Sequence, residues 1–487
     1  MTKSSTATSA SIRAKLKHPV IDADGHLLEM GPVLVEYLRQ IGGQAVADRF
    51  LRTENASNEL LLGRGRWHDL TPQQRRAAGL TPPAWWSFPT RNTVDRASVS
   101  LPRLLRSRMD DLGLDFSVLY PTMGMGLAGI ADEELRRAAC RAYNTYVSET
   151  YHDCRDRMTP VAVIPMVTPA EAIAEIEHAT RALGLKAVMI GIVRRATPSA
   201  DERWFSHRID ALGFESDYDY DPVWAKCIEC KVAAVSHSTA RGWDGRRSPT
   251  NGIFNHLGHF AAAGEALCRA IFMGGVTRRF PTLNFAFLEG GVAWGSGLYN
   301  GLIAHWEKRN VRALRENLDP ALLDRDLLVR LIAEYGHAKV KTQMAAMEQQ
   351  VRRIPPGPAQ IDEWATCQIE QAEDIRDLFV PHFFFGCEAD DPMNACAFDT
   401  KMNKFGVRLQ AILGSDIGHW DVPDMDKMLV EAHELVEHNL ISENDFTDFV
   451  FTNPARLHAG MNPDFFAGTV VEGAVRGLQA NRGVSRR

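Results

Sequence analysis

The sequence predicts an α/β fold, a distorted (β/α)8 (TIM) barrel with helical insertions, and three observations support this class. Eight short, continuous apolar segments recur along the 487 residues, as is typical of parallel strands buried on both faces. Most of these segments follow a stretch with the apolar spacing of a helix, which is the alternation that a barrel needs. The hydrophobic content of 45% is ample for one large core. An open, doubly wound sheet is the second choice.

The predicted elements follow one another in a regular order. The eight strands are residues 20–26, 116–122, 159–165, 185–191, 231–238, 283–291, 381–390 and 408–416. The clearest helices before these strands are residues 101–113, 132–157, 169–184 and 221–230. In the third helix, Pro169 near the start and Gly184 at the end are residue types that favour helix boundaries. Residues 424–438 and 443–460 are predicted to form closing helices after the last strand.

Two long segments interrupt this repeat, and we predict that both are insertions in a single domain. Residues 30–100 are rich in Trp and Pro and separate the first two strands, whereas residues 310–380 are charged, helix-forming and separate strands six and seven. The barrel is predicted to span residues 18–465. We expect a flexible N-terminal tail at residues 1–17 and a C-terminal tail at residues 466–487.

The charge balance disfavours several classes of partner. A formal net charge of −6 and a pI near 6.3 leave no basic excess for nucleic acid or an anionic membrane. No apolar run reaches the roughly 18 residues of a membrane span, and the first residues lack the apolar core of a secretory signal. We therefore expect a cytoplasmic protein with a small-molecule substrate. We also expect a homo-oligomer, a dimer.

Polar side chains of metal-ligand types stand at the ends of five of the eight predicted strands. They are Asp24 and His26 on strand one, His237 on strand five, Glu289 on strand six, Glu388 and Asp390 on strand seven, and Asp416 on strand eight with His419 just beyond it. Barrel enzymes carry their chemistry at the carboxyl ends of the strands, so these groups are expected to meet at one mouth. Imidazole and carboxylate groups are ligands of Zn²⁺, Mn²⁺ and Fe²⁺, so the sequence predicts a divalent metal site.

Each of these residues has an ordinary explanation when it is taken alone. His237 can be a core histidine, Asp416 a helix N-cap and Glu289 the cap of a turn. As a set they need a cation, because several carboxylates in one pocket would otherwise repel one another and raise their pKa values. Asp22 lies deeper in the barrel than Asp24, and we predict that it is structural or supports a ligand.

Five stretches in a fixed order resemble the amidohydrolase superfamily. They are VIDADGHLLE (20–29), VSHS (235–238), RRFPTLNFAFLEGGVAW (278–294), ILGSDIGHWDVPDM (412–425) and FTNPARL (451–457). The sequence is most similar to the amidohydrolase-2 branch, which includes aminocarboxymuconate-semialdehyde decarboxylase and related enzymes. The resemblance covers nearly the whole chain and implies a metal-dependent barrel enzyme.

The resemblance also implies a set of metal ligands. The matching positions are Asp24, His26, His237 and Asp416. The strand-one H-x-H of the family is replaced here by Asp24-Gly25-His26, which keeps the spacing. Many decarboxylases of this branch carry a histidine at the end of strand six, where this sequence has Glu289. That departure weighs against decarboxylation.

The number of ions is left open at one or two per chain. One ion, Zn, Fe or Mn, fits the four family ligands, because the set has no thiolate. A second ion can be held by Glu289 together with His256, which follows strand five by a short loop. His259, three residues after His256, is predicted to be a supporting or structural residue.

Hydrolysis is the reaction predicted first. A divalent metal brings the pKa of a bound water near neutrality, and the resulting hydroxide attacks an acyl or similar carbon. Asp416 is predicted to take the proton, and His419 to stabilise the oxyanion or to orient Asp416.

Two other functions are kept open. The first is non-oxidative decarboxylation of an aromatic or enoic acid, with Asp416 or Glu289 as the proton donor. The aromatic stretch PPAWWSFP at residues 82–89 would suit a lid over an apolar substrate, although core packing explains it as well. The second is a barrel without catalysis that binds a partner, which the filled ligand positions disfavour.

Overall fold

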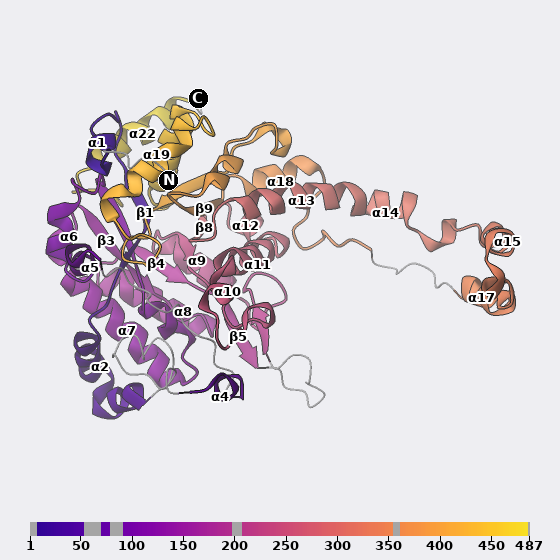
Figure 1. Ribbon diagram of the computed structural model, residues 1–487, viewed down its shortest axis with the longest axis horizontal. Helices are drawn as coiled ribbons and strands as arrows, with labels where there is room; N and C mark the ends of the chain where they lie inside the picture. The colour runs from indigo at the N-terminus through magenta and orange to yellow at the C-terminus, as the bar shows by residue number, and fades with distance from the viewer. Residues whose placement is uncertain (1–6, 53–69, 78–90, 197–206, 354–360, 486–487) are drawn as a thin grey trace.

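A single sheet of eight parallel strands forms the centre of the molecule. The computed structural model describes residues 7–52, 70–77, 91–196, 207–353 and 361–485. The strands pair in the order β1-β2-β3-β4-β7-β8-β9-β10, and every pair in this sheet is parallel. Helices surround the strands in Figure 1, and the sheet curls into a nearly closed barrel. This arrangement confirms the predicted (β/α)8 class.

All eight predicted strands form, and most are shorter than the apolar runs that predicted them. They are β1 (Ile21–Leu27), β2 (Phe116–Pro121), β3 (Met158–Val163), β4 (Ala187–Ile190), β7 (Ala234–Ser236), β8 (Phe285–Phe287), β9 (Phe383–Glu388) and β10 (Gln410–Gly414). Nearly every strand residue is buried, so both faces of each strand pack against apolar side chains. This double burial is the reason that the strands read as continuous apolar runs.

Helices on the outside of the barrel connect successive strands. The main ones are α6 (Pro102–Arg108), α7 (Glu133–Thr150), α8 (Pro169–Glu177), α9 (Asp221–Glu229), α11 (His259–Met273), α12 (Val276–Arg279), α13 (Ala293–Arg309), α18 (Ala372–Phe379), α19 (Met428–Glu437), α20 (Glu443–Thr447) and α21 (Asn453–Ala459). The predicted start of α8 is confirmed, since the Thr168 hydroxyl accepts a hydrogen bond from the Glu171 amide and Pro169 follows it. None of the helices in the described ranges is long and apolar enough to cross a membrane.

The barrel closes between its first and last strands through side chains as well as backbone. The described β1 and β10 form no ladder, although the Asp416 amide donates to the Asp24 carbonyl at 3.1 Å. The buried Asp22 carboxylate completes the seam. It accepts hydrogen bonds from the Ser415 amide at 2.9 Å, the Ser415 hydroxyl at 2.7 Å and the Ser117 hydroxyl at 2.6 Å. Asp22 is therefore structural, as the sequence predicted.

A small antiparallel hairpin was not predicted. Strands β5 (Val193–Ala196) and β6 (His207–Asp210) pair with each other outside the barrel, between β4 and α9. Each strand has only four residues, and the sequences VRRA and HRID are too short and too charged to give an apolar alternation.

The first insertion is largely helical where it is described. It contains α2 (Gly31–Arg52), which bends at Gly43 where φ is +81°, α4 (Pro72–Ala77) and α5 (Thr93–Ser98). Helix α2 packs along α7 on the outside of the barrel. The PPAWWSFP stretch falls outside the described residues, and its predicted lid stays a prediction.

The second insertion projects from the body. It contains α14 (Val311–Asn317), α15 (Arg325–Tyr335), α16 (Ala338–Lys341) and α17 (Met344–Arg352), and it returns to the barrel at α18. Figure 1 shows this segment extending away from the barrel beyond α13, with α15 and α17 at its far end.

Both predicted tails contain folded elements. The prediction of a flexible tail over residues 1–17 is wrong for its second half. Helix α1 (Ser9–Arg13) begins with a capping box from Thr8 and buries Ile12 in the core. At the other end, Phe466 and Val471 are buried and α22 (Glu472–Ser485) follows. A short terminal helix of this kind is fixed by packing against the body, which its own composition does not reveal.

Candidate metal centre

The predicted ligands lie together at the carboxyl ends of the barrel strands. Asp24 and His26 belong to β1, and His237 directly follows β7. Glu289 and Asp416 come two residues after β8 and β10 respectively. Because all these strands are parallel and neighbouring ends meet at one mouth, residues from widely separated parts of the chain form one cluster.

The imidazole and carboxylate atoms of this cluster are within ion-sharing distance. The two Nε2 atoms of His26 and His237 are 3.3 Å apart. His26 Nε2 lies 3.3 Å from Asp416 Oδ1, and His237 Nε2 lies 3.1 Å from Glu289 Oε2. Asp24 Oδ1 completes the set at 3.6 Å from His26 Nε2 and 3.7 Å from His237 Nε2. We call these five residues the cage.

His419 joins the cage from the loop after β10. Its Nδ1 atom lies 2.6 Å from Asp416 Oδ1 and 3.9 Å from Glu289 Oε1, and its Nε2 atom is 3.3 Å from the Thr122 hydroxyl. Its ring lies over that of His26, with centroids 3.9 Å apart. The predicted contact between His419 and Asp416 is therefore present.

The donor set fits a divalent cation. Apart from the ion-pair contacts with the imidazoles given above, Asp24 Oδ1, Glu289 Oε2 and both carboxylate oxygens of Asp416 are buried and have no hydrogen-bond partner within the described ranges. Buried carboxylate oxygens without donors are costly unless a positive charge faces them. Two overlapping groups of residues can be defined, and within each group the donor atoms all lie within 4.8 Å of one another. The first group is His26, Glu289, Asp416 and His419, and the second is Asp24, His26 and His237.

Burial sets the protonation of the cage. Desolvation raises the pKa of Asp24, Glu289 and Asp416 well above the usual carboxyl values, and the mutual repulsion of these carboxylates adds to the rise at Asp24 and Asp416. Desolvation also lowers the pKa of His26 and His237, so both imidazoles stay neutral, as metal ligands must be. A bound cation would reverse the carboxyl shifts, because it favours the ionised form.

Backbone strain is concentrated at two of the carboxylates. Glu289 has a φ of +55° and Asp416 a φ of +46°, the left-handed region that side-chain-bearing residues rarely adopt. Gly25, between Asp24 and His26, is required by close packing: a Cβ there would lie 2.4 Å from Asp22 Oδ2 and 2.7 Å from the Ser117 hydroxyl. The D-G-H spacing therefore also depends on the seam described above.

His256 is not part of the cage, contrary to the expected second ion. Its ring lies against His259 and Trp420, with centroid separations of 4.6 Å and 5.6 Å, and it belongs to neither described ion-sharing group. It is the last residue of α10 (Gly252–His256), and the Trp420 ring that it contacts belongs to the loop after β10. The predicted pairing of His256 with Glu289 around a second ion is therefore not seen among the described residues. His259 is supporting, as predicted: it is fully buried, and its Nδ1 lies 2.8 Å from the Thr239 hydroxyl.

Strand seven contributes to the rim of the mouth and not to the cage. Glu388, at the end of β9, belongs to neither group, although burial and the neighbouring carboxylates raise its pKa to about 8. Asp390 is exposed. The structure thus brings together six of the eight predicted strand-end residues, and Glu388 and Asp390 stay outside the cluster.

Sequence reasoning missed Arg241, five residues beyond the end of β7. Its Nε atom is buried without a hydrogen-bond partner, and its guanidinium makes no ion pair in the described ranges. Its charge lowers the pKa of His419 and opposes the rise at Glu289, so it lies beside the cage. The sequence SHSTARG (236–242) could have pointed to Arg241, because this arginine follows the predicted ligand His237 by four residues.

Tyr120 on β2 was missed as well. Its ring is fully buried, with its centroid 5.8 Å from that of His237, and its hydroxyl has no hydrogen-bond partner in the described ranges. Nothing in the apolar run FSVLYPT distinguishes it from a core tyrosine.

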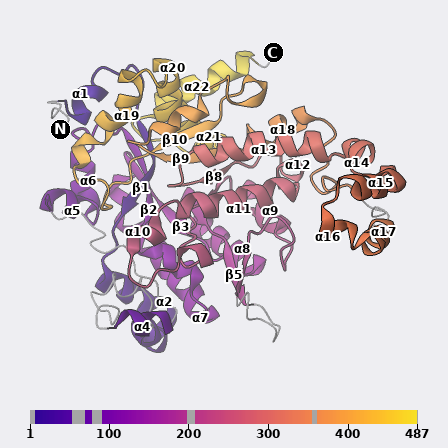
Figure 2. The same ribbon diagram turned by 45° about the vertical axis from the view of Figure 1, so that its right-hand side comes forward.

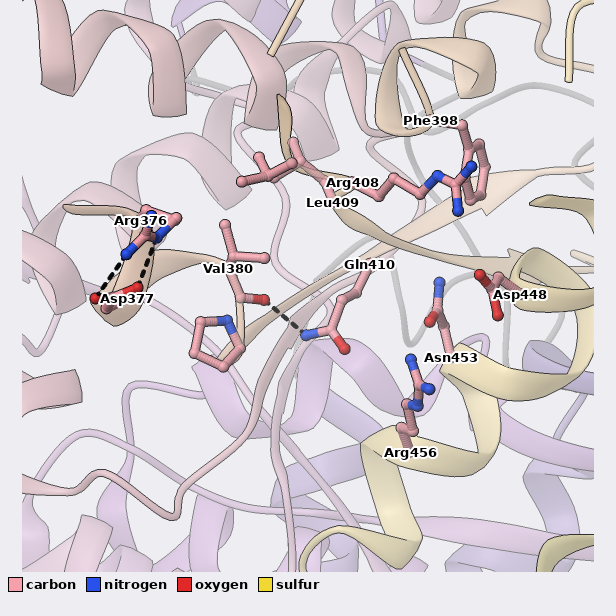
Figure 3. Close-up of a pocket in the computed structure, with 12 residues that line it drawn as sticks. Arg376, Asp377, Val380, Phe398, Arg408, Leu409, Gln410, Asp448, Asn453 and Arg456 are labelled. Carbon is pink, nitrogen blue, oxygen red and sulfur yellow. Dashed lines mark hydrogen bonds and ion pairs between the residues drawn. The ribbon is translucent and has the colours of Figure 1, made fainter. Parts of the chain in front are cut away.

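The opposite end of the barrel holds a separate cavity of about 480 Å³ (Figure 3). It lies at the start of β9 and β10, where Gln410 Nε2 donates to the Val380 carbonyl at 2.8 Å and Arg376 pairs with Asp377. None of the cage residues lines it. The chemistry of the molecule therefore belongs to the other mouth.

An eight-stranded parallel barrel with an imidazole–carboxylate cage at the carboxyl ends of its strands is the architecture of a metal-dependent barrel enzyme. The chain belongs to the amidohydrolase family: the family model described as Amidohydrolase (Amidohydro_2) matches residues 21–340. The sequence matches no curated protein.

Several solved structures are similar to this chain at low identity, and the first named here, with a TM-score above 0.5, shows the same fold. An amidohydrolase of Mycobacterium avium subsp. paratuberculosis is 17% identical with a TM-score of 0.51, and the match covers 91% of this chain and 99% of that one. A 4-oxalomesaconate hydratase of Rhodopseudomonas palustris is 12% identical (TM-score 0.44, 96% and 100% covered). A 5-carboxyvanillate decarboxylase of Novosphingobium aromaticivorans with bound manganese is 13% identical (TM-score 0.44, 91% and 98% covered).

Proposed function

We propose that this protein is a metal-dependent, non-oxidative decarboxylase of a small aromatic or enoic acid. The observation that carries the proposal is Arg241, whose buried Nε has no hydrogen-bond partner among the described residues and whose charge acts on Glu289 of the cage. A cation next to a metal site favours an anionic substrate, and a guanidinium binds a carboxylate through two parallel hydrogen bonds.

The cage residues would hold the ion. Asp24, His26, His237, Glu289 and Asp416 supply two imidazoles and three carboxylates without a thiolate, a set that suits Mn, Fe or Zn. When bound, the ion would supply Lewis acidity toward an oxygen of the substrate.

Arg241 would orient the acid. A carboxylate held by its guanidinium would lie beside Glu289 and His419, two of the groups on which the Arg241 charge acts. The same charge also lowers the pKa of His256 and His259. The buried environment strengthens this pairing, because little water competes for the guanidinium.

The proton comes from the pair formed by His419 and Asp416. In decarboxylation the carbon–carbon bond to the carboxylate breaks, CO₂ leaves, and the electron pair stays on the substrate carbon, which then takes a proton. Asp416 can deliver that proton, since its Oδ1 lies 2.6 Å from His419 Nδ1 and the proton can be shared between them. Thr122, 3.3 Å from His419 Nε2, holds the imidazole on its other side.

Hydrolysis is the second candidate, and the same contact favours it. Activation of a water also requires a proton acceptor, and Asp416 in contact with His419 would serve as one. Hydrolysis of an ester, lactone or amide has no need of Arg241 unless the substrate carries an anionic group as well.

Isotope uptake distinguishes the two reactions. Protein loaded with Mn²⁺ or Zn²⁺ is incubated in D₂O with a panel of 2-hydroxybenzoates and 2-enoic acids, and in H₂¹⁸O with esters, lactones and amides. The proposal expects CO₂ release together with one deuterium on the carbon that lost the carboxylate. Uptake of ¹⁸O into product from the second panel, with no CO₂ from the first, would replace it by hydrolysis.

Arg241 variants test the substrate class. Arg241→Met should raise KM for the active acid by about 100-fold, and Arg241→Lys should restore part of this loss, because one charge-assisted contact is kept. Arg155→Met, an exposed arginine at the other end of the barrel, is the matched control and should behave as wild type. An unchanged KM in Arg241→Met would remove the basis for an acid substrate.

A further inference from the structure

The second insertion contains a projecting arm, which we define as residues 311–353. It begins where α13 ends at Arg309, and it carries helices α14 to α17. Figures 1 and 2 both show it leaving the body, with α15 and α17 at the end furthest from the barrel. The arm is thus held to its own chain only at its base.

The arm has almost no core of its own. Only Ala313 and Val351 are buried among residues 311–353. Helix α15 packs against α17, but none of its own residues is buried. Fixing a residue in one backbone conformation costs about 1–2 kcal/mol, which folded segments recover mainly by burying apolar surface. An ordered arm of this length therefore requires another surface to cover it.

An apolar stripe marks the side that needs covering. Its members are Leu318, Leu322, Leu323, Leu327, Leu331 and Tyr335, and their exposed fractions lie between 39% and 74%. Leu327, Leu331 and Tyr335 are four residues apart and form one face of α15. Contiguous exposed apolar side chains of this kind mark interaction sites on soluble proteins.

An apolar groove lies on the body near the base of the arm. This cavity of about 600 Å³ runs between α11 and α13, and Met273, Leu298 and Leu302 line it. Gly297 and Gly301 open it further, because a Cβ at either position would meet no atom within 4 Å. A helix can therefore approach the α13 backbone closely at this point.

The charges around the groove are already neutralised. Arg269 pairs with Glu265 at 2.8 Å, and Arg309 pairs with Glu363 at 2.7 Å. The groove thus presents an apolar floor between closed ion pairs, which suits a leucine-rich helix better than a charged ligand. The stripe on α15 has that chemistry, but it lies at the far end of the arm from the groove of its own chain.

We propose that two copies of this chain exchange arms, so that the stripe of each copy fills the α11–α13 groove of the other. Stripe and groove are different surfaces of one chain, and a two-fold axis lets both contacts form at once and closes the assembly. The second copy is the occupant that the surfaces specify, since each supplies what the other lacks. The proposal is independent of the reaction catalysed.

Sedimentation equilibrium of the full chain tests the assembly. Wild type is expected at twice 54.2 kDa. The double variant Leu327→Asp with Leu331→Asp, and the groove variant Gly301→Trp, should each be monomeric at low micromolar concentration with an unchanged far-UV spectrum. Gln349→Asp, on exposed α17, is the control and should stay dimeric. A monomeric wild type, or a dimer that the double variant does not dissociate, would overturn the proposal.

Mixed cross-linking tests the exchange itself. Chains carrying Leu331→Cys are mixed with chains carrying Gly301→Cys and oxidised, and intact mass identifies the disulfide species. The proposal expects the mixed dimer to predominate. Cross-linked dimers of Leu331→Cys alone would show contact between two arms and would exclude the groove as the docking site. If the groove binds an unrelated protein and not a second copy, the purified chain would remain monomeric in the sedimentation experiment.

Discussion

Asp416 and Glu289 each combine a buried carboxylate with a left-handed backbone. A residue with a side chain pays about 1 kcal/mol or more for this conformation, and burial without a partner adds to the cost. Both residues follow strands whose last residues are buried. The turn that directs each carboxylate into the barrel therefore requires the left-handed backbone conformation. The cage thus lowers the stability of the fold, because charged groups are held there in a strained and buried arrangement.

Ligand removal should abolish metal retention. His237→Ala and Asp416→Ala should each reduce the metal content from about one ion per chain to near zero and lower activity by more than about 100-fold, with the barrel still folded. Metal analysis by mass spectrometry and far-UV circular dichroism provide the readouts. His256→Ala is the matched control, since His256 lies outside the cage, and it should retain the ion. Full metal occupancy in Asp416→Ala would show that the ligand assignment is wrong.

The metal-free protein should gain stability when a cage carboxylate is neutralised. Asp416→Asn removes a repelling charge and places at φ +46° a residue type that tolerates this region. We expect an increase in the free energy of unfolding of about 1–2 kcal/mol in the presence of a chelator. With metal present the order should reverse, because only wild type gains binding energy. Asp111→Asn, on the exposed surface, should change neither value.

The residues of the cage were largely predictable, whereas their neighbours were not. Asp24, His26 and His237 could be found because polar groups at the ends of apolar strands are conspicuous. His256 was misplaced because its position depends on the path of the loop after β7, which no periodicity describes. Arg241 escaped notice for the same reason, since only the folded loop shows that its Nε is buried without a partner in the part of the chain that is described.

At the scale of elements, the seam between β1 and β10 depends on one side chain. Asp22→Ala would leave the Ser117 and Ser415 donors buried without an acceptor, and we expect a loss of about 3 kcal/mol or more in the free energy of unfolding. A double-mutant cycle with Ser415→Ala, measured by urea unfolding, should give a coupling energy of about 1–2 kcal/mol. Additive single effects would show that the seam is held by backbone contacts alone.

Glu29 ties the end of β1 to the loop after β2 and should make stability depend on pH. Its buried carboxylate accepts hydrogen bonds from the amides of Met123 at 3.0 Å and Gly124 at 2.7 Å. Burial nevertheless raises its pKa from 4.5 to about 7. A raised carboxyl pKa means that its contribution is full below about pH 4.5 and is lost as the pH rises through 7.

The measurement is a comparison of unfolding at pH 5 and pH 8. Relative to Glu29→Gln, wild type should lose up to about 3 kcal/mol of unfolding free energy over this interval. Glu316→Gln, an exposed residue of the arm, should follow wild type. Parallel pH profiles for wild type and Glu29→Gln would show that the carboxylate is already ionised in the folded state throughout.

The elements that the sequence predicted are those with burial on both faces. The run FFFG within Phe383–Glu388 has no polar residue that could face water, so its strand was unambiguous. The hairpin of β5 and β6 and the helix α1 have mixed composition, and their conformation comes from packing on the finished barrel. Short elements of this kind cannot be derived from local sequence, because local preference does not determine them.

At the scale of the whole molecule, the exchange of arms links stability to concentration. If each chain covers its partner's groove, the midpoint of thermal unfolding should rise as the protein is concentrated from about 1 to 100 μM. Differential scanning calorimetry measures this shift directly. The double variant Leu327→Asp with Leu331→Asp should lose the concentration dependence, whereas Gln349→Asp should keep it. A midpoint independent of concentration in wild type would contradict an obligate dimer.

The order of synthesis determines when the cage can form in each chain. Asp24 and His26 leave the ribosome 390 residues before Asp416, which is roughly 20–80 s of synthesis at 5–20 residues per second. A nascent chain therefore carries an incomplete set of ligands for most of its translation. The complete cage arises only when β10 reaches β1, so all five residues can face an ion together only after the barrel has closed. A product truncated before Asp416 would contain most of the strands and no functional site.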